Sequence, residues 1–531
     1  MAPHEPIWEI IARRARETPQ RTMIVEADGS TVTYGDAREI VLSWAAGLGD
    51  QPGRGARRVG AVVPNCASHY LLRLACVQAG ATFLALNPLL KGYLLRDAIA
   101  RAAVTDLVVS RETEASVTAA CAGLAAGLAI HRLDGRSFLS RTGVPGAQGK
   151  LARPGCGQIV LYTSGTTGPA KPVRLTSATV QSYACTLFGD EDPVWTPAAG
   201  YYSPWHPAHV LGAVALDVAV VRGLALVLRR KFSRSDFWSD IVAHNCEATM
   251  LITVADDILA HREPWQASNP LKVAGMSPLV ENVQDFEAYF GVTVVSVYGM
   301  TEVGNVLTAR SPADSRITGR PIRGYQVRLV DVPGIGVVTS RAGRVGELVV
   351  RPSQVTSEYE LEGEPAAGAW QDGWFYTGDL FTESEGSYSF VGRIKDAIRR
   401  HGRNISAADL EGVIRMLDGV ADCTCVGVPH PDPSGRPAAA DDEIRVFVVA
   451  EPGAVIDPEP FLARLAECLP GFMLPRYLDV VRDLPRTLSG KVSRQALRAV
   501  PIGPATYDRK GLPVVPAAKG ALLSRGTRRD L

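Results

Sequence analysis

Short apolar runs alternate along the first three hundred residues with longer segments whose apolar positions recur at helical spacing. The segment Ser68–Gly80 is typical of the helical pattern. This alternation favours βα units that assemble into parallel sheets. The runs that predict buried strands are Arg58–Pro64, Asp106–Ser110, Gln158–Ser164, Leu224–Arg230, Ala248–Val254 and Val292–Gly299.

The pattern changes near residue 320, where strands joined by glycine-rich turns predict a small antiparallel β unit. These strands are Tyr325–Asp331, Gly346–Pro352 and Ser387–Arg393. From about Arg393 a fresh αβ pattern begins, which predicts a second domain. Within it, Pro429–Glu443 has the composition of a mobile loop.

We therefore predict an α/β protein of more than one domain, because 531 residues exceed one ordinary core. Residues 1–392 would form a large domain of βα units with a small antiparallel β unit. Residues 393–500 would form a small α+β domain. Residues 501–531 would form a basic, flexible tail.

The composition of the chain limits the kinds of molecule that it is expected to bind. The chain is 46% apolar and 21% charged, with a net charge of +1, so it has no global basic field for nucleic acid or an anionic membrane. An odd number of cysteines, nine, cannot all pair, which favours reduced thiols. The N-terminus lacks the pattern of a secretory signal. We expect a soluble cytoplasmic protein, and the sequence leaves its oligomeric state open.

The loop from Thr163 to Pro172, TSGTTGPAKP, carries the clearest chemistry. It follows a predicted strand, its glycines let the backbone approach an anion, and Lys171 adds a positive charge. It is not a Walker A loop, because Lys171 follows alanine and precedes proline. Composition alone favours an ordinary loop over a phosphate site.

Four further motifs follow in a fixed order. They are VYGMTE (Val297–Glu302), GWFYTGDL (Gly373–Leu380), GRIKDAIRRHGRNISAADLE (Gly392–Glu411) and LPRTLSGKVSRQALR (Leu484–Arg498). With the first loop they make the chain resemble the adenylate-forming superfamily of acyl-CoA synthetases, luciferases and peptide-synthetase adenylation domains, over roughly residues 5–499. It looks most similar to the crotonobetaine/carnitine-type and medium-chain acyl-CoA ligases.

The resemblance implies that ATP activates a carboxylate as an acyl-adenylate, with Mg²⁺ as cofactor and CoA as the expected acceptor. The step brings an anion to a polyanion, so the site must supply positive charge. The implied phosphate and metal residues are Thr163, Ser164, Gly165, Thr166, Thr167, Gly168 and Lys171 for the outer phosphates, Thr301 for the α-phosphate and Glu302 for Mg²⁺. Of the other implied ATP-binding residues, Tyr298 would stack on adenine, and Asp379 and Arg393 would contact the ribose. The resemblance assigns ATP binding also to Met276, Ser277, Pro278, Gly299 and Met300.

The resemblance also implies that the large domain consists of stacked αβ subdomains with a small β-barrel-like unit, and that residues 393–500 form a mobile α+β lid domain. The remaining implied roles concern this lid and the acid. Lys491 would be the catalytic lysine, delivered by rotation about a hinge at Lys395, and Gly402 would lie in the loop that guides the thiol of CoA. The acid pocket would contain Trp205, His206, Gly275 and Met276, with His206 beside the reacting carboxylate.

Taken without the resemblance, six of these residues have an ordinary structural alternative. The alternatives are a solvated helix N-terminal carboxylate for Glu302, a half-buried strand aromatic for Tyr298, an Asx-turn residue between strands for Asp379, a surface arginine for Arg393, an exposed turn lysine for Lys491 and a packed core histidine for His206.

Three departures from the family pattern bear on the substrate. Pro172 stands where relatives usually have glycine, which removes one N–H donor. Met276 replaces a glycine and should fill the pocket, which predicts a small acid, and Trp205 points to an aromatic or planar one. Ala407 replaces a frequent proline beside the thiol loop, which leaves the acceptor open.

The function expected is therefore an ATP-dependent, AMP-forming ligase that activates a small, possibly aromatic carboxylic acid and transfers it to CoA. The alternatives are another acceptor or substrate, namely a carrier protein, an amine, or nitrite in diazotisation of an aryl amine. An alternative of another class is a non-catalytic nucleotide-binding protein, against which the presence of both Lys491 and Glu302 argues.

Overall fold

The computed structural model describes most of the chain. The described residues are 5–48, 57–90, 92–122, 128–134, 137–140, 157–162, 172–189, 193–260, 269–280, 282–332, 345–352, 357–359, 370–396, 398–400, 403–405, 407–431, 437–469, 471–487 and 490–510. They fall into two compact units, a large unit within 1–330, 347–377 and 381–390, and a small unit within 331–346, 378–380 and 391–531. The domain limits expected at 392 and 500 stay predictions.

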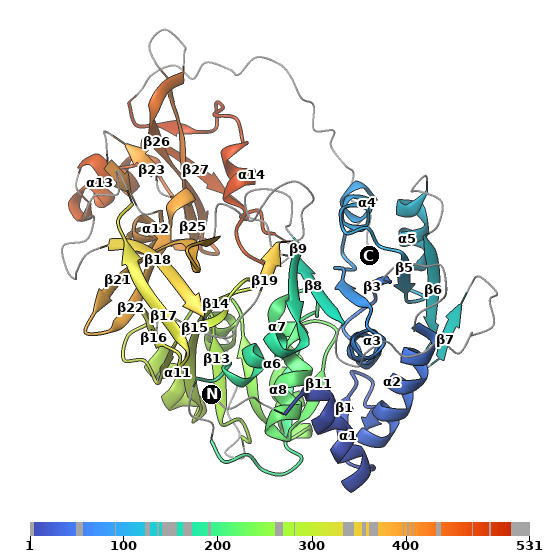
Figure 1. Ribbon diagram of the computed structural model, residues 1–531. Helices are drawn as coiled ribbons and strands as arrows, with labels where there is room; N and C mark the ends of the chain where they lie inside the picture. Colours follow the sequence, from blue (N-terminus) through green and yellow to red (C-terminus); the bar gives the residue numbers. More distant parts are fainter. Residues whose placement is uncertain are drawn as a thin grey trace. The chain divides into compact units, whose positions relative to one another are not determined.

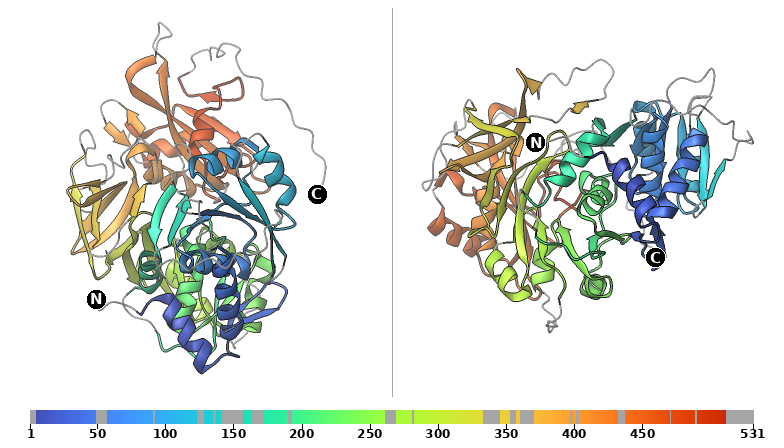
Figure 2. Two further views of the ribbon diagram at one scale, coloured as in Figure 1. Left: turned by 45° about the vertical axis from the view of Figure 1, so that its right-hand side comes forward. Right: turned by 60° about the horizontal axis from the view of Figure 1, so that its bottom comes forward.

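The first sheet of the large unit is mostly parallel, as the alternating pattern predicts (Figure 1). Its order is β19 (Ser357–Tyr359), β9 (Pro172–Thr176), β8 (Gln158–Tyr162), β4 (Thr82–Ala85), β3 (Arg58–Val62), β5 (Asp106–Val109), β6 (Ala129–Asp134) and β7 (Ser137–Ser140). Helices α2 (Tyr34–Leu48) and α3 (Ala67–Gln78) pack on one face, and α4 (Gly92–Arg101) and α5 (Glu114–Cys121) on the other. The blue helices stay beside the blue-to-cyan strands in both turned views (Figure 2).

The second sheet has a parallel centre that continues into antiparallel strands. Its centre comprises β11 (Ala225–Leu228), β10 (Gly200–Ser203), β12 (Cys246–Leu251), β13 (Val273–Met276) and β14 (Thr293–Met300), extended beyond β11 by β1 (Thr22–Val25) and β2 (Thr31–Thr33). One face is covered by α1 (Ile7–Glu17), α6 (Ser177–Cys185) and α8 (Ala215–Arg222). The other is covered by α9 (Arg234–Ala243), α10 (Ala255–Ala260) and α11 (Val283–Phe290).

One hydrophobic core joins these two sheets, which confirms the stacked αβ arrangement. Residues of α1, α2, α3, α6 and α8 pack in it with strand residues from both sheets. The helices lie between the sheets and are therefore apolar on more than one side, as in α3, where the described side chains from His69 to Gln78 are buried without a break.

The antiparallel strands near residue 320 are confirmed, but they continue the second sheet. Strand β15 (Gly304–Arg310) pairs with β14 on one side and with β16 (Ile317–Pro321) on the other. The path then runs through β22 (Ser387–Arg393), β21 (Trp374–Ser384), β18 (Val345–Pro352) and β17 (Tyr325–Val330), with β20 (Trp370–Gln371) beside β21. The expected barrel-like unit is thus joined to the αβ sheet by backbone pairing.

The small unit is a four-stranded sheet between helices. Its order is β25 (Val420–Pro431), β26 (Pro437–Ala450), β27 (Tyr477–Val481) and β28 (Tyr507–Asp508). Helices α12 (Ala407–Arg415) and α13 (Pro458–Cys468) pack on one face and α14 (Arg494–Arg498) on the other. A short hairpin, β23 (Ile398–Arg400) and β24 (Arg403–Ile405), precedes α12.

Two segments of the small unit differ from expectation. The loop predicted over Pro429–Glu443 is wrong for most of its length, because β25 and β26 pair as far as Pro431 and Pro437. The segment expected to begin a flexible tail contributes β28, which pairs with β27 through Tyr507 and Asp508. Residues 511–531 lie outside the described part. No helix among the described residues is long and apolar enough to cross a membrane.

Candidate active site

The loop predicted to hold the outer phosphates, with Thr163, Ser164, Gly165, Thr166, Thr167, Gly168 and Lys171, lies outside the described residues. Its flanks are described: β8 ends at Tyr162 and β9 begins at Pro172, and these two residues pair across an antiparallel ladder. The loop therefore leaves and rejoins the sheet at neighbouring positions. Its role with phosphate stays a prediction.

The motif VYGMTE closes β14 and forms the turn to β15. Tyr298 packs its ring edge-on against Phe381, with 4.9 Å between centroids. Thr301 and Glu302 belong to the turn, across which Met300 pairs with Gly304. Glu302 is only 6% exposed. The solvated helix-terminus alternative for Glu302 is therefore wrong, because the residue is buried in a turn between two strands.

Gly275 and Met276 end β13, and their side-chain positions lie on opposite faces of the sheet. Met276 is fully buried in the cluster that includes Leu251 and Phe286, under α11. Met276 therefore faces away from the side of the sheet on which Met250 lies, and its expected place in the substrate pocket stays a prediction. Met250 of β12 occupies the space over Gly275 instead: a Cβ at Gly275 would clash with the Met250 sulfur.

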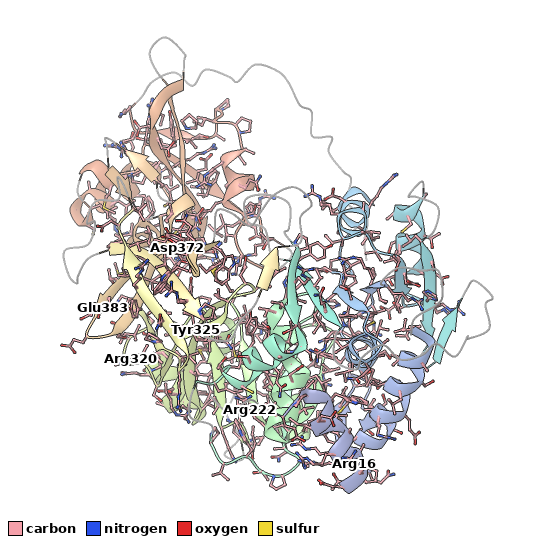
Figure 3. The ribbon with its side chains drawn as sticks, viewed as in Figure 1. Arg16, Arg222, Arg320, Tyr325, Asp372 and Glu383 are labelled. Atoms are coloured by element: carbon pink, nitrogen blue, oxygen red, sulfur yellow. The ribbon has the colours of Figure 1, made fainter. Side chains whose placement is uncertain are left out.

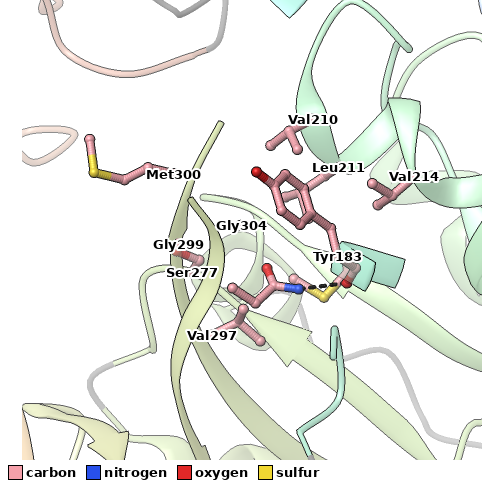
Figure 4. Close-up of a pocket in the computed structure, with 11 residues that line it drawn as sticks. Tyr183, Val210, Leu211, Val214, Ser277, Val297, Gly299, Met300 and Gly304 are labelled. Carbon is pink, nitrogen blue, oxygen red and sulfur yellow. Dashed lines mark hydrogen bonds between the residues drawn. The ribbon is translucent and has the colours of Figure 1, made fainter. Parts of the chain in front are cut away.

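A cavity opens at the carboxyl ends of β12, β13 and β14, where open α/β sheets bind their ligands (Figure 4). Among the described residues its apolar lining comprises Val210, Leu211, Val214, Met250, Val297 and Met300. The rest of the lining is Tyr183, Ser277, Asn305, Gly299 and Gly304. About 70 Å³ is open to the centres of water-sized molecules. None of these lining side chains is charged.

Three of the predicted site residues, Ser277, Gly299 and Met300, line this cavity. Sequence reasoning missed Met250 and the apolar wall from α7 (Val210–Ala213). Met250 lies one residue before the end of its strand, so the rule that ligands bind beyond the carboxyl ends of parallel strands could have indicated it.

Trp205 and His206 are held by backbone groups. The Trp205 indole N–H donates to the Met250 carbonyl at 2.7 Å. His206 Nε2 lies 2.8 Å from the Val63 carbonyl, and its Nδ1 accepts the Ala208 N–H at 3.0 Å. Burial lowers the pKa of His206 to about 4, so the ring is neutral at pH 7. Neither side chain lines the cavity, and their roles with substrate stay predictions.

The two residues predicted to bind ribose are brought together. Asp379 was expected in a loop between strands, but it lies within β21 and is 2% exposed. Arg393 ends β22, and its Nε lies 3.1 Å from Asp379 Oδ1. The arrangement presents a buried carboxylate oriented by an arginine, a pair able to bind two hydroxyl groups.

The remaining lid residues are described only in part. Lys491 is exposed on a turn closed by the Thr487 N–H, which donates to the Lys491 carbonyl at 2.7 Å. Lys395 lies in the short helix η1 (Ile394–Asp396), and only the backbone of Lys395 is described. Gly402 lies outside the described residues. The hinge and acceptor roles stay predictions.

The described residues contain no cluster of three or more His, Cys, Asp or Glu side chains able to hold a metal ion. A metal bound here would need ligands from the substrate. Mg²⁺ fits that condition, because it is usually held by one or two carboxylates together with substrate phosphates and waters. The buried carboxylate of Glu302 is a donor of the suitable kind.

Comparison with known proteins agrees with this architecture. The sequence profile of the AMP-binding enzyme family matches residues 11–360, and that of the AMP-binding enzyme C-terminal domain matches residues 409–491. The ATP-bound structure of MatB from Rhodopseudomonas palustris superposes with a TM-score of 0.77 at 24% identity, covering 93% of this chain and 98% of that one.

Two curated relatives extend along nearly the whole chain. A sulfoacetate–CoA ligase of Cupriavidus necator is 28% identical over 510 residues, 92% of this chain and 96% of that protein. A feruloyl-CoA synthase of an Amycolatopsis species is 27% identical over 500 residues, 92% of this chain and 98% of that protein. With the first profile covering residues 11–360 of 531, the chain belongs to the AMP-binding enzyme family, the adenylate-forming superfamily that its motifs resemble.

Proposed function

We propose that the chain is an ATP-dependent acid–CoA ligase. It activates a small carboxylic acid as an acyl-adenylate with release of pyrophosphate, and then transfers the acyl group to CoA. The family membership supports the adenylate chemistry, and relatives named as CoA ligases over nine-tenths of the chain support CoA as acceptor. The observation that carries the choice of acid is the small uncharged cavity beside Ser277 and Gly299.

The first half-reaction forms a bond between a carboxylate oxygen and the α-phosphorus and breaks the bond from that phosphorus to pyrophosphate. Both reactants are anionic, so the site must supply positive charge at the transition state. We assign this task to Lys491, with Lys171 at the outer phosphates and the Thr301 hydroxyl at the α-phosphate. Glu302 would hold Mg²⁺, which when bound supplies charge that offsets the triphosphate.

The nucleotide is held by groups of ordinary recognition chemistry. Tyr298 offers an aromatic face to adenine, and Asp379 accepts from the ribose hydroxyls while Arg393 orients its carboxylate. In the second half-reaction the thiolate of CoA attacks the acyl carbon and AMP leaves. We assign the guidance of CoA to the loop at Gly402.

The acid itself is short and aliphatic in this proposal. A cavity of about 150 Å³ is the size that holds benzene, whereas this one offers about 70 Å³. Its lining has no lysine or arginine among the described residues to pair with a second anionic group. The body of the acid is therefore apolar and smaller than an aromatic ring.

Acid-dependent exchange of labelled pyrophosphate into ATP tests this proposal directly. The panel comprises acetate, propionate, butyrate, benzoate, ferulate, sulfoacetate and nitrite, each with MgATP. We expect the highest rates with the short aliphatic acids. Preference for benzoate or sulfoacetate would overturn the assignment of the acid. Exchange with nitrite alone would favour the oxyanion alternative. ATP binding without exchange for any acid would indicate a non-catalytic nucleotide-binding protein.

A separate experiment identifies the acceptor. The best acid is incubated with MgATP and CoA, an amine, or no acceptor, and the products are identified by mass spectrometry. We expect an acyl-CoA thioester. Amide formation with CoA left unmodified would overturn CoA as the acceptor without affecting the adenylation step.

A further inference from the structure

The three-residue turn Thr301–Val303 is held from two sides by tyrosines that sequence analysis did not identify, one buried and one partly buried. The turn joins β14 to β15 and carries Thr301 and Glu302, to which the proposed function assigns the α-phosphate and Mg²⁺. Its conformation thus fixes where both functional groups point. The inference below rests on that proposed function.

Tyr183 holds the first side. It comes from α6 and is 1% exposed. Its hydroxyl donates to the Thr301 carbonyl at 3.2 Å. Burial raises the pKa of Tyr183 well above 10, and the neighbouring Tyr325 and Glu302 raise it further, so the hydroxyl remains a proton donor at any working pH. The ring projects along the cavity beside Gly304 (Figure 4).

Tyr325 holds the second side. It begins β17, and its hydroxyl donates to the Val303 carbonyl at 2.6 Å. Burial raises its pKa as well. Figure 3 labels Tyr325 in the sheet. The carbonyl groups on the two sides of Glu302 thus each accept one phenolic hydrogen bond, from elements more than 140 residues apart in sequence.

The neighbouring residues leave the turn little room to shift. Gly304 has φ of +77°, and a Cβ there would clash with the Tyr183 ring, so the ring packs directly on the backbone that follows the turn. The Asn305 side-chain amide donates to the Tyr183 carbonyl at 2.8 Å. Both the backbone carbonyl and the ring of Tyr183 therefore contact the start of β15, which fixes helix α6 against that strand.

We propose that Tyr183 and Tyr325 are positioning residues for adenylate formation. They fix the backbone on both sides of Glu302, and with it the Glu302 carboxylate and the Thr301 hydroxyl that receive the metal–nucleotide complex. Mg²⁺ demands near-ideal geometry, and a displacement of about 1 Å in a catalytic group is costly. Removing either phenolic hydroxyl therefore weakens metal-dependent nucleotide binding while leaving the acid cavity in place.

The test compares Tyr183→Phe and Tyr325→Phe with a matched control, Tyr201→Phe. Tyr201 is a fully buried tyrosine whose hydroxyl has no hydrogen-bond partner among the described residues. Calorimetry measures the Kd of ATP with and without Mg²⁺, in the absence of any acid. Pyrophosphate exchange measures the Mg²⁺ concentration at half-maximal rate.

We expect each Tyr183 and Tyr325 variant to weaken Mg²⁺-dependent ATP binding about tenfold, a typical loss for a group that orients a metal ligand. The same variants should need more Mg²⁺ for exchange. Tyr325→Phe should also leave the KM for the acid unchanged, because Tyr325 is not among the described residues that line the cavity. Tyr201→Phe should match the wild type. Thermal unfolding verifies that all three fold, and if Tyr183→Phe does not, the partly exposed Tyr325 carries the test alone.

Variants that bind MgATP as the control does would overturn the inference. This outcome is distinct from failure of the proposed function. If the wild type shows no acid-dependent exchange, the ligase proposal fails, whereas calorimetry still decides whether the two tyrosines position the metal–nucleotide site.

Discussion

The Met250 sulfur lies over Gly275, its direct neighbour in the parallel pair β12–β13, and takes the place where a side chain at residue 275 would lie. Met250 also lines the cavity at the strand ends. In the proposed function, Met250 therefore limits the size of the acid. Met250→Ala should enlarge the cavity, raising kcat/KM for benzoate relative to propionate by about 10- to 100-fold, the range set by a few methylene groups.

Met276→Ala is the matched control for this change. Met276 is as deeply buried as Met250 but on the opposite face of the sheet. Both variants should lose about 2–5 kcal/mol of stability, because each leaves a cavity in a packed core. Only Met250→Ala should alter the acid preference. A shift caused by Met276→Ala would contradict the placement of the two methionines.

Lys491 provides a prediction that separates the half-reactions. Lys491→Ala should slow acid-dependent pyrophosphate exchange by about 100-fold or more, because it removes the cation that offsets charge at the α-phosphate. Thioester formation from a supplied acyl-adenylate should persist, and it serves as the internal control. A bulky residue at Gly402 should have the reverse effect. Equal loss of both steps in Lys491→Ala would contradict separate roles.

The C-terminal strand β28 should stabilise the small unit. Arg476 is 1% exposed and donates to both carboxylate oxygens of Asp508, each at 3.1 Å. Asp508→Ala leaves this buried charge without its main partner, which should cost about 3 kcal/mol or more. Hydrogen exchange of peptides from β26 to β28 should accelerate, with the large unit unchanged.

Asp418→Ala is the control for that prediction. Asp418 pairs with Arg464 at 3.0 Å, but its side chain is 95% exposed. The expected loss is under about 1 kcal/mol. Equal exchange behaviour of the Asp508 and Asp418 variants would show that β28 does not support the sheet.

Stability should fall as pH drops from about 6.5 to 4. Burial lowers the pKa of His206 to about 4, and burial lowers that of the neighbouring His69 well below 6.5. The unfolded chain therefore binds more protons in this window, and stability falls by up to about 1.4 kcal/mol per pH unit for each histidine. Burial raises the pKa of Glu26, which acts in the opposite direction.

Comparison with a His206→Gln variant isolates the contribution of one ring. Denaturant titrations at pH 7, 6, 5 and 4 should give the variant a shallower decline than the wild type, with the difference confined to this window. Identical slopes would contradict a neutral His206 in the folded chain.

Most of the fold could be predicted from the sequence, because hydrophobic periodicity indicates local secondary structure. The strand predicted at Asp106–Ser110 is β5, and the helix predicted at Ser68–Gly80 is α3. The segment Pro429–Glu443 was misjudged because proline and glycine indicate a turn but not its length. Here β25 and β26 extend on both sides of the turn, supported by pairing that composition does not express.

From the sequence, the site could be predicted only as a set of motifs. Motif order indicated Asp379 and Arg393, and the structure pairs them. Which methionine faces the cavity depends on strand register, since a shift of one residue exchanges the faces. Tyr183 and Tyr325 belong to no motif, and only the tertiary structure brings their hydroxyls to the turn at Glu302.

In the proposed function, ATP is cleaved at the α-phosphorus to activate an acid. The most direct measurement separates the nucleotides formed when the purified protein is incubated with MgATP, CoA and its best acid. We expect AMP and pyrophosphate, with AMP formed in equal amount to the acyl-CoA. Formation of ADP and phosphate, with no AMP for any acid, would contradict it.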